Sequence, residues 1–268
     1  VHDLKAAKPT GFGSVPRLWV KFQAGIHSKI PPARLRLLLA IPMISRIVAR
    51  RIREGMGFED CTKFASGSAP ISPHTLRWYQ KLGINIGEGW GMTEGAPFCI
   101  NAAHIEPKLL SVGVPVPETE VEIVDVESGT QVLARGETGE VRVRGPQNML
   151  GYRNNPEETA KTLRDGWVYS GDIGYIADDG YVSLVDRKKD MILVGGYNVY
   201  PRDVDEILFN HPKIREAAVV GKRDNRLGEV VAAFVVLDKD ATMDEEEFFA
   251  YCAESMVKYK RPVEVHFV

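Results

Sequence analysis

The amino-acid sequence predicts an α/β protein that ends in a smaller α+β unit, and three observations lead to this prediction. Residues 61–94 follow the order strand, turn, helix, strand, turn. Residues 120–186 alternate apolar and polar side chains with a period of two, which is typical of antiparallel strands. Beyond residue 190, strand-like and helix-like segments mix over about eighty residues, a usual size for one domain.

The composition is that of an ordinary globular chain. Of 268 residues, 44% are hydrophobic and 26% are charged, so the chain can bury a sizeable core. A net charge of −2 gives no general attraction to nucleic acid, and we expect no nucleic-acid partner. The three cysteines lie far apart, without metal or disulfide spacing, which suits a reducing, cytoplasmic location. Because the chain begins at Val1 and a strand-like run reaches Val268, we expect a piece of a longer protein.

Two helical regions are predicted at the beginning of the chain. Pro16 suits a first helical turn, and the Pro31–Pro32 pair interrupts the chain after it. Residues 33–53 alternate apolar residues with arginines, which predicts a helix interrupted near Pro42. Such a helix can lie on a membrane surface, or it can pack its apolar face on the core with its arginines in solvent. We favour the second interpretation, and a peripheral membrane contact stays open.

The βαβ unit follows this helical region. Residues 61–65 form a short strand that leads into the small-residue turn Ser66–Pro70. Ser72 is a suitable N-cap, with Pro73 at the first helical position. The next strand, 82–86, leads into a glycine-rich turn. Both turns would then lie at the carboxyl ends of their strands, where ligands bind in open α/β sheets.

The glycine-rich stretch Gly87–Glu94 is the strongest candidate for a binding site. Its three glycines leave the backbone accessible, and Trp90 offers a face for stacking. Thr93 and Glu94 add a hydroxyl and a carboxylate, a combination that suits a nucleotide with its metal ion. The alternative is a glycine-rich turn with a buried tryptophan. A dinucleotide fingerprint would need glycine in place of Met92, and no P-loop motif occurs.

The predicted β unit contains two further features. A helix is predicted from its N-cap Asn155 to Leu163. Asp172 lies between two glycines after an aromatic strand, where it could accept two hydrogen bonds from a diol; the alternative is a turn aspartate that bonds its own backbone. The charge cluster 186–190 then separates two differently patterned regions, which predicts a hinge or domain boundary. The elements expected beyond it are strands 191–194, 217–220, 230–237 and 263–268 and helices 201–210 and 244–255.

Four blocks, taken together, resemble the adenylate-forming superfamily of acyl-CoA synthetases, luciferases and peptide-synthetase adenylation domains. These blocks are Ser-Gly-Ser-Ala-Pro (66–70), Gly-Trp-Gly-Met-Thr-Glu (89–94), Tyr-Ser-Gly-Asp (169–172) and Asp-Arg-Lys-Lys-Asp-Met-Ile-x-x-Gly-Gly (186–196). The segment 14–26 is most like long-chain fatty acid:CoA ligases. The resemblance implies that residues 1–120 end a large doubly wound AMP-binding α/β domain. It further implies that residues 121–186 are the β subdomain of that domain, and residues 187–268 a mobile C-terminal α+β domain.

The resemblance also implies a two-step reaction. A carboxylate attacks the α-phosphate of ATP to give an acyl-adenylate and pyrophosphate. The C-terminal domain then rotates, and the thiol of coenzyme A displaces AMP. The implied partners are a medium- or long-chain fatty acid, ATP with Mg²⁺, and coenzyme A, with no particular oligomeric state. Two alternatives remain: a truncated or pseudoenzyme fragment that binds nucleotide or acyl-CoA without turnover, and an acid:carrier-protein ligase.

Individual residues receive roles from the same resemblance. The implied nucleotide-binding residues are Gly67, Ser68, Ala69, Gly89, Trp90, Gly91, Asp172 and Arg187. The first three resemble the turn that passes along adenine, and the second three the lining of the adenine and acyl sites. Asp172 would accept both ribose hydroxyls, and Arg187 would help to hold the ribose. Thr93 would hold the α-phosphate, and Glu94 would reach Mg²⁺.

The C-terminal motif residues complete the implied site. Lys189 matches the hinge, and Gly195 and Gly196 match the backbone strip beside the pantetheine tunnel. Asn198 falls where relatives place a polar residue near the phosphates. The family's phosphate-binding loop and its C-terminal catalytic lysine do not occur in these residues. Since that lysine stabilises the charge that develops at phosphorus, we expect the 268 residues alone to adenylate poorly.

Overall fold

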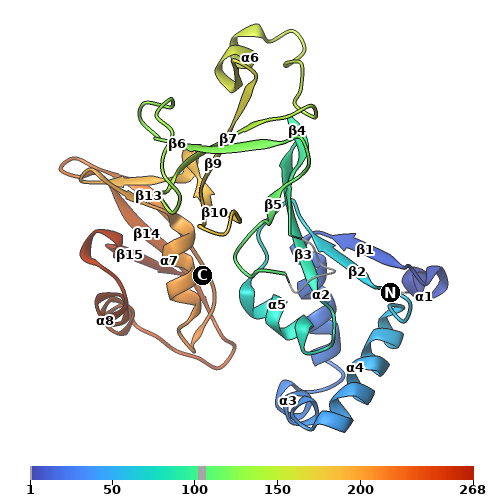
Figure 1. Cartoon of the computed structure of the whole chain (residues 1–268). Coiled ribbons are helices and arrows are strands. Elements are labelled where there is room, and N and C mark those ends of the chain that lie inside the picture. The colour runs from blue at the N-terminus through green and yellow to red at the C-terminus, as the bar shows by residue number, and fades with distance from the viewer. Residues whose placement is uncertain (1, 102–106) are drawn as a thin grey trace.

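The computed structural model describes residues 2–101 and 107–268, which form three five-stranded sheets. In Figure 1 the N-terminal part of the chain lies at the right, the second sheet at the top and the C-terminal part at the left. Their succession along the chain agrees with the predicted α/β class.

The first sheet contains the predicted βαβ unit. Its strands, in spatial order, are β1 (Gly11–Ser14), β2 (Lys63–Ser66), β3 (Ile86–Met92), β4 (Gly95–Ile100) and β5 (Val114–Pro115). β1, β2 and β3 are parallel, and helix α5 (Pro73–Gln80) connects β2 to β3. The predicted cap is confirmed, because the Ser72 hydroxyl accepts a hydrogen bond of 3.2 Å from the backbone N–H of Thr75.

The prediction of a glycine-rich turn at residues 87–92 was wrong, because these residues form most of β3. Gly89 pairs with Ile100 of β4, and the turn begins only at Thr93. None of the glycines at 87, 89 and 91 has a positive φ angle, so their backbone is compatible with an extended strand. A Cβ on Gly91 would lie 2.9 Å from Cβ of Ala96, so a glycine here lets the hairpin close. Pairing with β4 thus overrides the weak strand preference of glycine.

Four helices surround the N-terminal strands: α1 (His2–Ala7), α2 (Pro16–His27), α3 (Pro32–Ala40) and α4 (Pro42–Met56). The predicted interruption near Pro42 is present, with Ile41 in extended conformation between α3 and α4. Trp19 of α2 is fully buried, and its backbone oxygen accepts a hydrogen bond of 2.6 Å from the Tyr79 hydroxyl. The aromatic core of this part forms around this pair.

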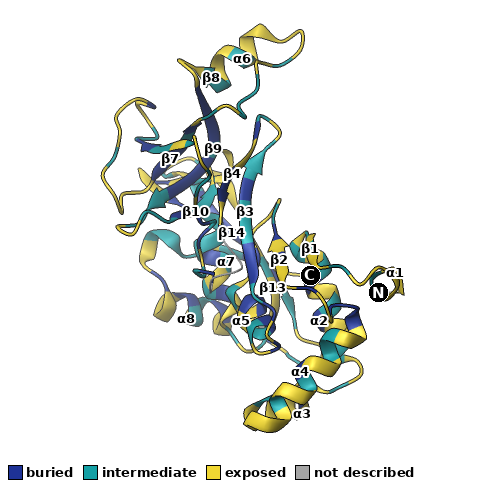
Figure 2. Ribbon diagram, turned by 45° about the vertical axis from the view of Figure 1, so that its right-hand side comes forward, coloured by how far each residue is buried: buried dark blue, intermediate teal, exposed yellow. Residues whose placement is uncertain are grey.

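The expectation that residues 33–53 pack an apolar face on the core is confirmed for only part of the segment, since Ala49 belongs to the N-terminal core and Leu39 and Ile52 pack against it. In α3 and α4 only Leu35, Ala49 and Met56 are buried. Both helices are drawn mostly in the colour of exposed residues at the lower end of Figure 2. The apolar side chains around the junction of α3 and α4 therefore face outward.

The second sheet is the predicted antiparallel β unit. Its strands are β6 (Glu120–Val124), β7 (Gly139–Arg144), β8 (Leu163–Arg164), β9 (Trp167–Ile176) and β10 (Val182–Arg187). The order is β10-β9-β7-β6, with β8 beside β9, and every pairing is antiparallel. Helix α6 (Pro156–Thr162) begins as predicted, because the Asn155 side chain accepts a hydrogen bond from the N–H of Glu158.

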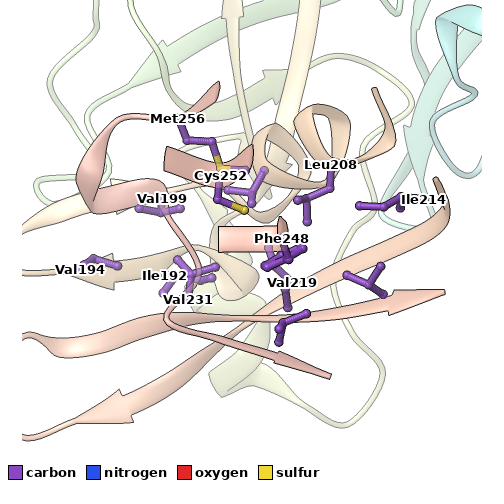
Figure 3. Close-up of a cluster of buried hydrophobic side chains, with 14 of the residues drawn as sticks. Ile192, Val194, Val199, Leu208, Ile214, Val219, Val231, Phe248, Cys252 and Met256 are labelled. Carbon is purple, nitrogen blue, oxygen red and sulfur yellow. The ribbon is translucent and has the colours of Figure 1, made fainter. Parts of the chain in front are cut away.

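The third sheet has a hydrophobic core of its own (Figure 3). After the 3-10 turn η1 (Lys188–Asp190), its elements are β11 (Ile192–Val194), β12 (Tyr197–Val199), α7 (Pro201–Phe209), β13 (Ile214–Asp224), β14 (Gly228–Leu237), α8 (Glu245–Ser255), the 3-10 turn η2 (Lys258–Lys260) and β15 (Glu264–Phe267). Phe248 of α8 is fully buried near the centre of this core. The predicted segments are present, and β12 is a strand that the sequence pattern did not predict.

None of the helices in the described part of the chain is both long enough and apolar enough to cross a bilayer.

Candidate functional site

A cavity of about 270 Å³ lies among elements that meet near the centre of Figure 1. Its lining comes from the loop after β2, strand β3, residues 110–112, strands β9 and β10, and the start of α7. The volume is near the lower end of the range for small-molecule sites, about 300–1,000 Å³. Strands of the first and second sheets and the start of helix α7, which are distant in the sequence, thus form one pocket.

The pocket contains many of the residues proposed from the sequence: Ser68, Ala69, Gly89, Trp90, Gly91, Asp172 and Arg187. Gly67 is not in the lining, but it approaches it closely, since a Cβ there would be 3.1 Å from the backbone oxygen of Gly89. Ser68 has a left-handed backbone, with a φ of 69°, at the bend where the loop leaves β2. The two small-residue stretches therefore meet, but only the loop after β2 lies at the carboxyl end of its strand, because Gly89, Trp90 and Gly91 lie within β3.

Asp172, which lines the pocket, connects the first and second sheets. The indole N–H of Trp90 donates a hydrogen bond of 2.7 Å to Oδ2, and Nε of Arg187 lies 2.8 Å from Oδ1. The side chain is only 10% exposed, whereas that of Arg187 is half exposed. The alternative of a turn aspartate bonded to its own backbone was wrong, because Asp172 lies within β9 and its carboxylate bonds Trp90 and Arg187.

Burial shifts the titration of two carboxyl groups in the pocket. Loss of hydration raises the pKa of Asp172, while the Arg187 charge and the Trp90 hydrogen bond oppose the shift. Burial raises the pKa of Glu88 to about 7, against a backbone hydrogen bond at Ile71 and the positive charge of Arg202. Near neutral pH, Glu88 can therefore donate a hydrogen bond as an acid or accept one as a carboxylate.

Sequence reasoning missed two charged residues of the pocket, Glu88 and Arg202. Glu88 lies inside the glycine-rich stretch, so its position alone could have marked it. Arg202 is the second residue of α7. Its backbone N–H donates a hydrogen bond of 2.9 Å to Oδ2 of Asp186, and its guanidinium donates one of 3.3 Å to the backbone oxygen of Leu184. No local pattern predicts that an arginine after the cluster 186–190 reaches back to β10.

Thr93 and Glu94 are not in the lining of this pocket. They form the turn between β3 and β4, where Oε1 of Glu94 accepts a hydrogen bond of 2.5 Å from the Tyr152 hydroxyl. Within the described residues, no group of three or more His, Cys, Asp and Glu side chains could hold a metal ion. Mg²⁺ commonly takes one or two carboxylates and completes its shell with phosphates and water, so Glu94 fits it as a single ligand.

The remaining predicted residues also lie outside the pocket. Lys189 is exposed in η1, beside the ion pair of 2.7 Å between Lys188 and the buried Glu140. Gly195 and Gly196 form the turn between β11 and β12, with φ angles of 58° and 88° that favour glycine. Asn198 is exposed on β12, opposite Leu193. None of these four residues lines the pocket in this structure.

Two family models match the chain. The model for AMP-binding enzymes matches residues 1–153, and the model for the C-terminal domain of AMP-binding enzymes matches residues 203–268. The two matches contain the first sheet with β6 and β7, and most of the third sheet.

Curated relatives agree with this family. A long-chain-fatty-acid–CoA ligase from Bacillus subtilis (strain 168) is 44% identical over 199 residues, which cover 74% of this chain and 35% of that protein. A feruloyl-CoA synthase from an Amycolatopsis species is 37% identical over 245 residues, which cover 90% of this chain and 50% of that protein. The chain spans about a third to a half of the length of these relatives.

The fold is similar to that of a solved relative. ATP-bound MatB from Rhodopseudomonas palustris matches with a TM-score of 0.81 and 32% identity, over 99% of this chain and 48% of that one. The apo form of the same protein matches over the same shares with a TM-score of 0.66. With the pocket and the motifs that line it, these matches show that the chain belongs to the AMP-binding enzymes, the adenylate-forming superfamily that contains the acyl-CoA synthetases.

Proposed function

We propose that this chain is part of an ATP-dependent acid:CoA ligase that forms an acyl-adenylate and pyrophosphate, and then acyl-CoA and AMP. The observation that carries the proposal is the pocket that residues of the family's motifs line together. In it the buried Asp172 accepts a hydrogen bond from Trp90 and pairs with Arg187. A fixed carboxylate with two oriented oxygens is suited to accept hydrogen bonds from the two hydroxyls of a ribose.

The pocket residues then bind the nucleoside. Trp90 and the bare backbone of Gly89 and Gly91 present a flat wall to adenine, and Ser68 and Ala69 line the pocket from the loop after β2. Gly67 allows that loop to approach β3. Arg187, half exposed, neutralises Asp172 and can also hold the ribose.

Thr93 and Glu94 are proposed to act on the phosphates, at the hairpin turn beyond the pocket. Mg²⁺ bound to Glu94 would offset negative charge on the polyphosphate. Lys189 is the proposed hinge, and Gly195, Gly196 and Asn198 approach the coenzyme A tunnel or the phosphates when the C-terminal part rotates. The TM-score is 0.81 against ATP-bound MatB and 0.66 against the apo form of the same protein. This difference supports the proposal that parts of such a protein move relative to each other.

The proposed acid is a medium- or long-chain fatty acid, and the proposed location is the cytoplasm. The relatives include fatty-acid ligases, which support the fatty acid. The feruloyl-CoA synthase covers more of the chain, which makes an aromatic acid the second candidate.

Nucleotide binding can be measured on the 268-residue chain itself. We expect AMP to bind, and Asp172→Asn to weaken that binding by about ten- to a hundredfold, because a buried hydrogen-bonded charge is lost at a cost of about 1–3 kcal/mol. Titration calorimetry measures both constants. Asp179→Asn is the matched control, since that carboxylate is exposed and pairs with Lys108. Equal AMP affinity in all three proteins would remove Asp172 from the ribose site.

Catalysis must be measured on the longest natural protein that carries this chain. We expect pyrophosphate–ATP exchange only when a fatty acid is present, and a CoA thioester when coenzyme A is added. A panel of fatty acids of varied length, with ferulic acid, separates the two acid classes. Exchange without a CoA thioester would favour the carrier-protein alternative. AMP binding without exchange on any acid would favour a binding protein without turnover.

A further inference from the structure

The helix pair α3–α4 exposes an apolar tip that the proposed function does not use. The tip consists of Leu37, Ile41, Met43, Ile44 and Ile47. Met43 is 81% exposed and Leu37 is 66% exposed. In Figures 1 and 2 the two helices project from the lower end of the molecule. Single exposed apolar residues are ordinary, but a contiguous group at a projecting point marks an interaction surface.

Positive charge surrounds this tip. The exposed arginines of the two helices are Arg34, Arg36, Arg46, Arg50 and Arg51. Residues 28–58 contain seven basic residues and only one acidic residue, although the whole chain has a net charge of −2. That acidic residue, Glu54, pairs with Arg50 at 2.7 Å. The basic charge is thus local to the projecting helices, and the rest of the molecule is acidic.

Along α4 the exposed apolar residues come first and most of the arginines follow, with Arg46 between Ile44 and Ile47. Met43 and Ile47 are four residues apart and lie on one face near the start of the helix. Arg50 and Arg51 follow one turn later, toward the body of the protein. An apolar end with a collar of arginines is the arrangement by which helices enter the boundary between lipid headgroups and acyl chains.

We propose that the α3–α4 tip binds the surface of an anionic phospholipid membrane, with its apolar residues below the headgroups and its arginines on the lipid phosphates. Such a surface supplies negative charge and an apolar layer at adjacent depths, as this patch requires. Nucleic acid would satisfy the arginines but leave Met43 and Leu37 in water. A second copy of the chain would bring the two arginine collars together, which like-charge repulsion opposes. The proposal is independent of the proposed reaction.

Vesicle flotation of the 268-residue chain tests this proposal. We expect binding to vesicles of phosphatidylcholine and phosphatidylglycerol in equal parts, and much weaker binding to pure phosphatidylcholine. Binding should fall when ionic strength rises from about 0.1 M to about 1 M, because the screening length shortens from about 10 Å to about 3 Å. Equal binding to both vesicle types would overturn the assignment to anionic lipid.

Two variants separate the apolar and the charged contribution. Met43→Ser with Ile47→Ser should lower the partition coefficient at least about tenfold. Arg46→Gln with Arg51→Gln should lower it on the order of thirtyfold and flatten its salt dependence. Because these side chains are exposed, circular dichroism spectra and melting curves should match those of the parent chain.

Matched controls lie elsewhere on the surface. Leu150→Ser with Val132→Ser removes exposed apolar side chains of the second sheet region, and Arg223→Gln with Lys239→Gln removes exposed charges of the C-terminal part. Both controls should bind vesicles like the parent. If they lose as much affinity as the tip variants, binding is not local to α3–α4 and the proposal fails.

The other occupants of the tip give distinct results. A concentration-dependent dimer in sedimentation velocity that Met43→Ser with Ile47→Ser dissociates, without vesicle binding, would assign the tip to a second copy. Vesicle binding by the 268 residues but not by the longest natural protein that carries them would show that other parts of that protein cover the tip. Either result overturns the proposal.

Discussion

At the residue scale, Glu88 couples the pocket to pH. Its pKa is raised to about 7 from an ordinary value of 4.5, chiefly by burial. Between these values the folded chain keeps a proton that the unfolded chain has released. The folded state therefore binds more protons than the unfolded state, and its stability falls as pH rises from about 4.5 to 7.

The expected slope is up to about 1.4 kcal/mol of unfolding free energy per pH unit for this group. Urea unfolding at a series of pH values measures it, and Glu88→Gln should reduce it. Part of the slope should persist, because burial also raises the pKa of Asp205 to about 7. If Glu88→Gln leaves the pH profile unchanged, the carboxyl is not protonated in the folded pocket.

The residues of the site differ in how far the sequence predicts them. Asp172 and Trp90 could be chosen as binding residues because each lies in a distinctive local stretch. Their hydrogen bond could not be predicted, since it joins β3 to β9 across 82 positions. Arg202 has no local signal at all, and only the packing of α7 against β10 places it at the pocket.

At the scale of elements, two N-caps of the same chemistry should differ in effect. Ser72 caps α5, which buries Thr75, Leu76 and Tyr79, and Asn155 caps α6, which buries none of its residues. Ser72→Ala should therefore lower the unfolding free energy by about 1 kcal/mol. Asn155→Ala should change it by less than about 0.5 kcal/mol, because α6 can fray without opening the core.

Denaturant midpoints with unchanged slopes measure both effects. Amide exchange at residues 156–162 should quicken in Asn155→Ala. Equal losses of global stability in the two variants would contradict the idea that burial decides how much each cap contributes.

Helices with a proline or a capping residue at their start were predictable, since the signal is local. β3 was not, because its glycines favour a turn when considered alone and only the register with β4 makes them a strand. The sequence of α3 and α4 predicts helices correctly, but not that the apolar residues around their junction face outward. Burial depends on neighbouring elements, and within the described residues none covers Leu37 or Met43.

At the scale of the whole molecule, two hydrophobic cores are separate. One contains Trp19 and Leu82 with the N-terminal helices and strands, and the other contains Phe248 with the third sheet (Figure 3). Phe248→Ala should destabilise the C-terminal part by about 3–5 kcal/mol, and Leu82→Ala the N-terminal part by about 2–5 kcal/mol. The two losses should appear in different regions of the chain.

Hydrogen exchange with peptide-level mass spectrometry locates each loss. Phe248→Ala should speed exchange within residues 192–267, and Leu82→Ala within residues 11–100. A uniform change along the chain in both variants would mean that the molecule unfolds as one cooperative unit. The division into 1–120, 121–186 and 187–268, and the mobility of the last part, stay predictions.

Because of the hydrogen bond between Trp90 and Asp172, tryptophan fluorescence can report on the pocket. The emission of an indole depends on the polarity and charge around its ring, and the N–H of Trp90 is 2.7 Å from a carboxylate oxygen. A ligand that hydrogen-bonds to this oxygen of Asp172, or that moves it away from Trp90, alters the electric field at the indole of Trp90. Trp19 lies in the N-terminal core, and Trp167 lies beneath the guanidinium of Arg142. With the other tryptophans replaced by phenylalanine, the chain would carry its own optical probe of the occupied site.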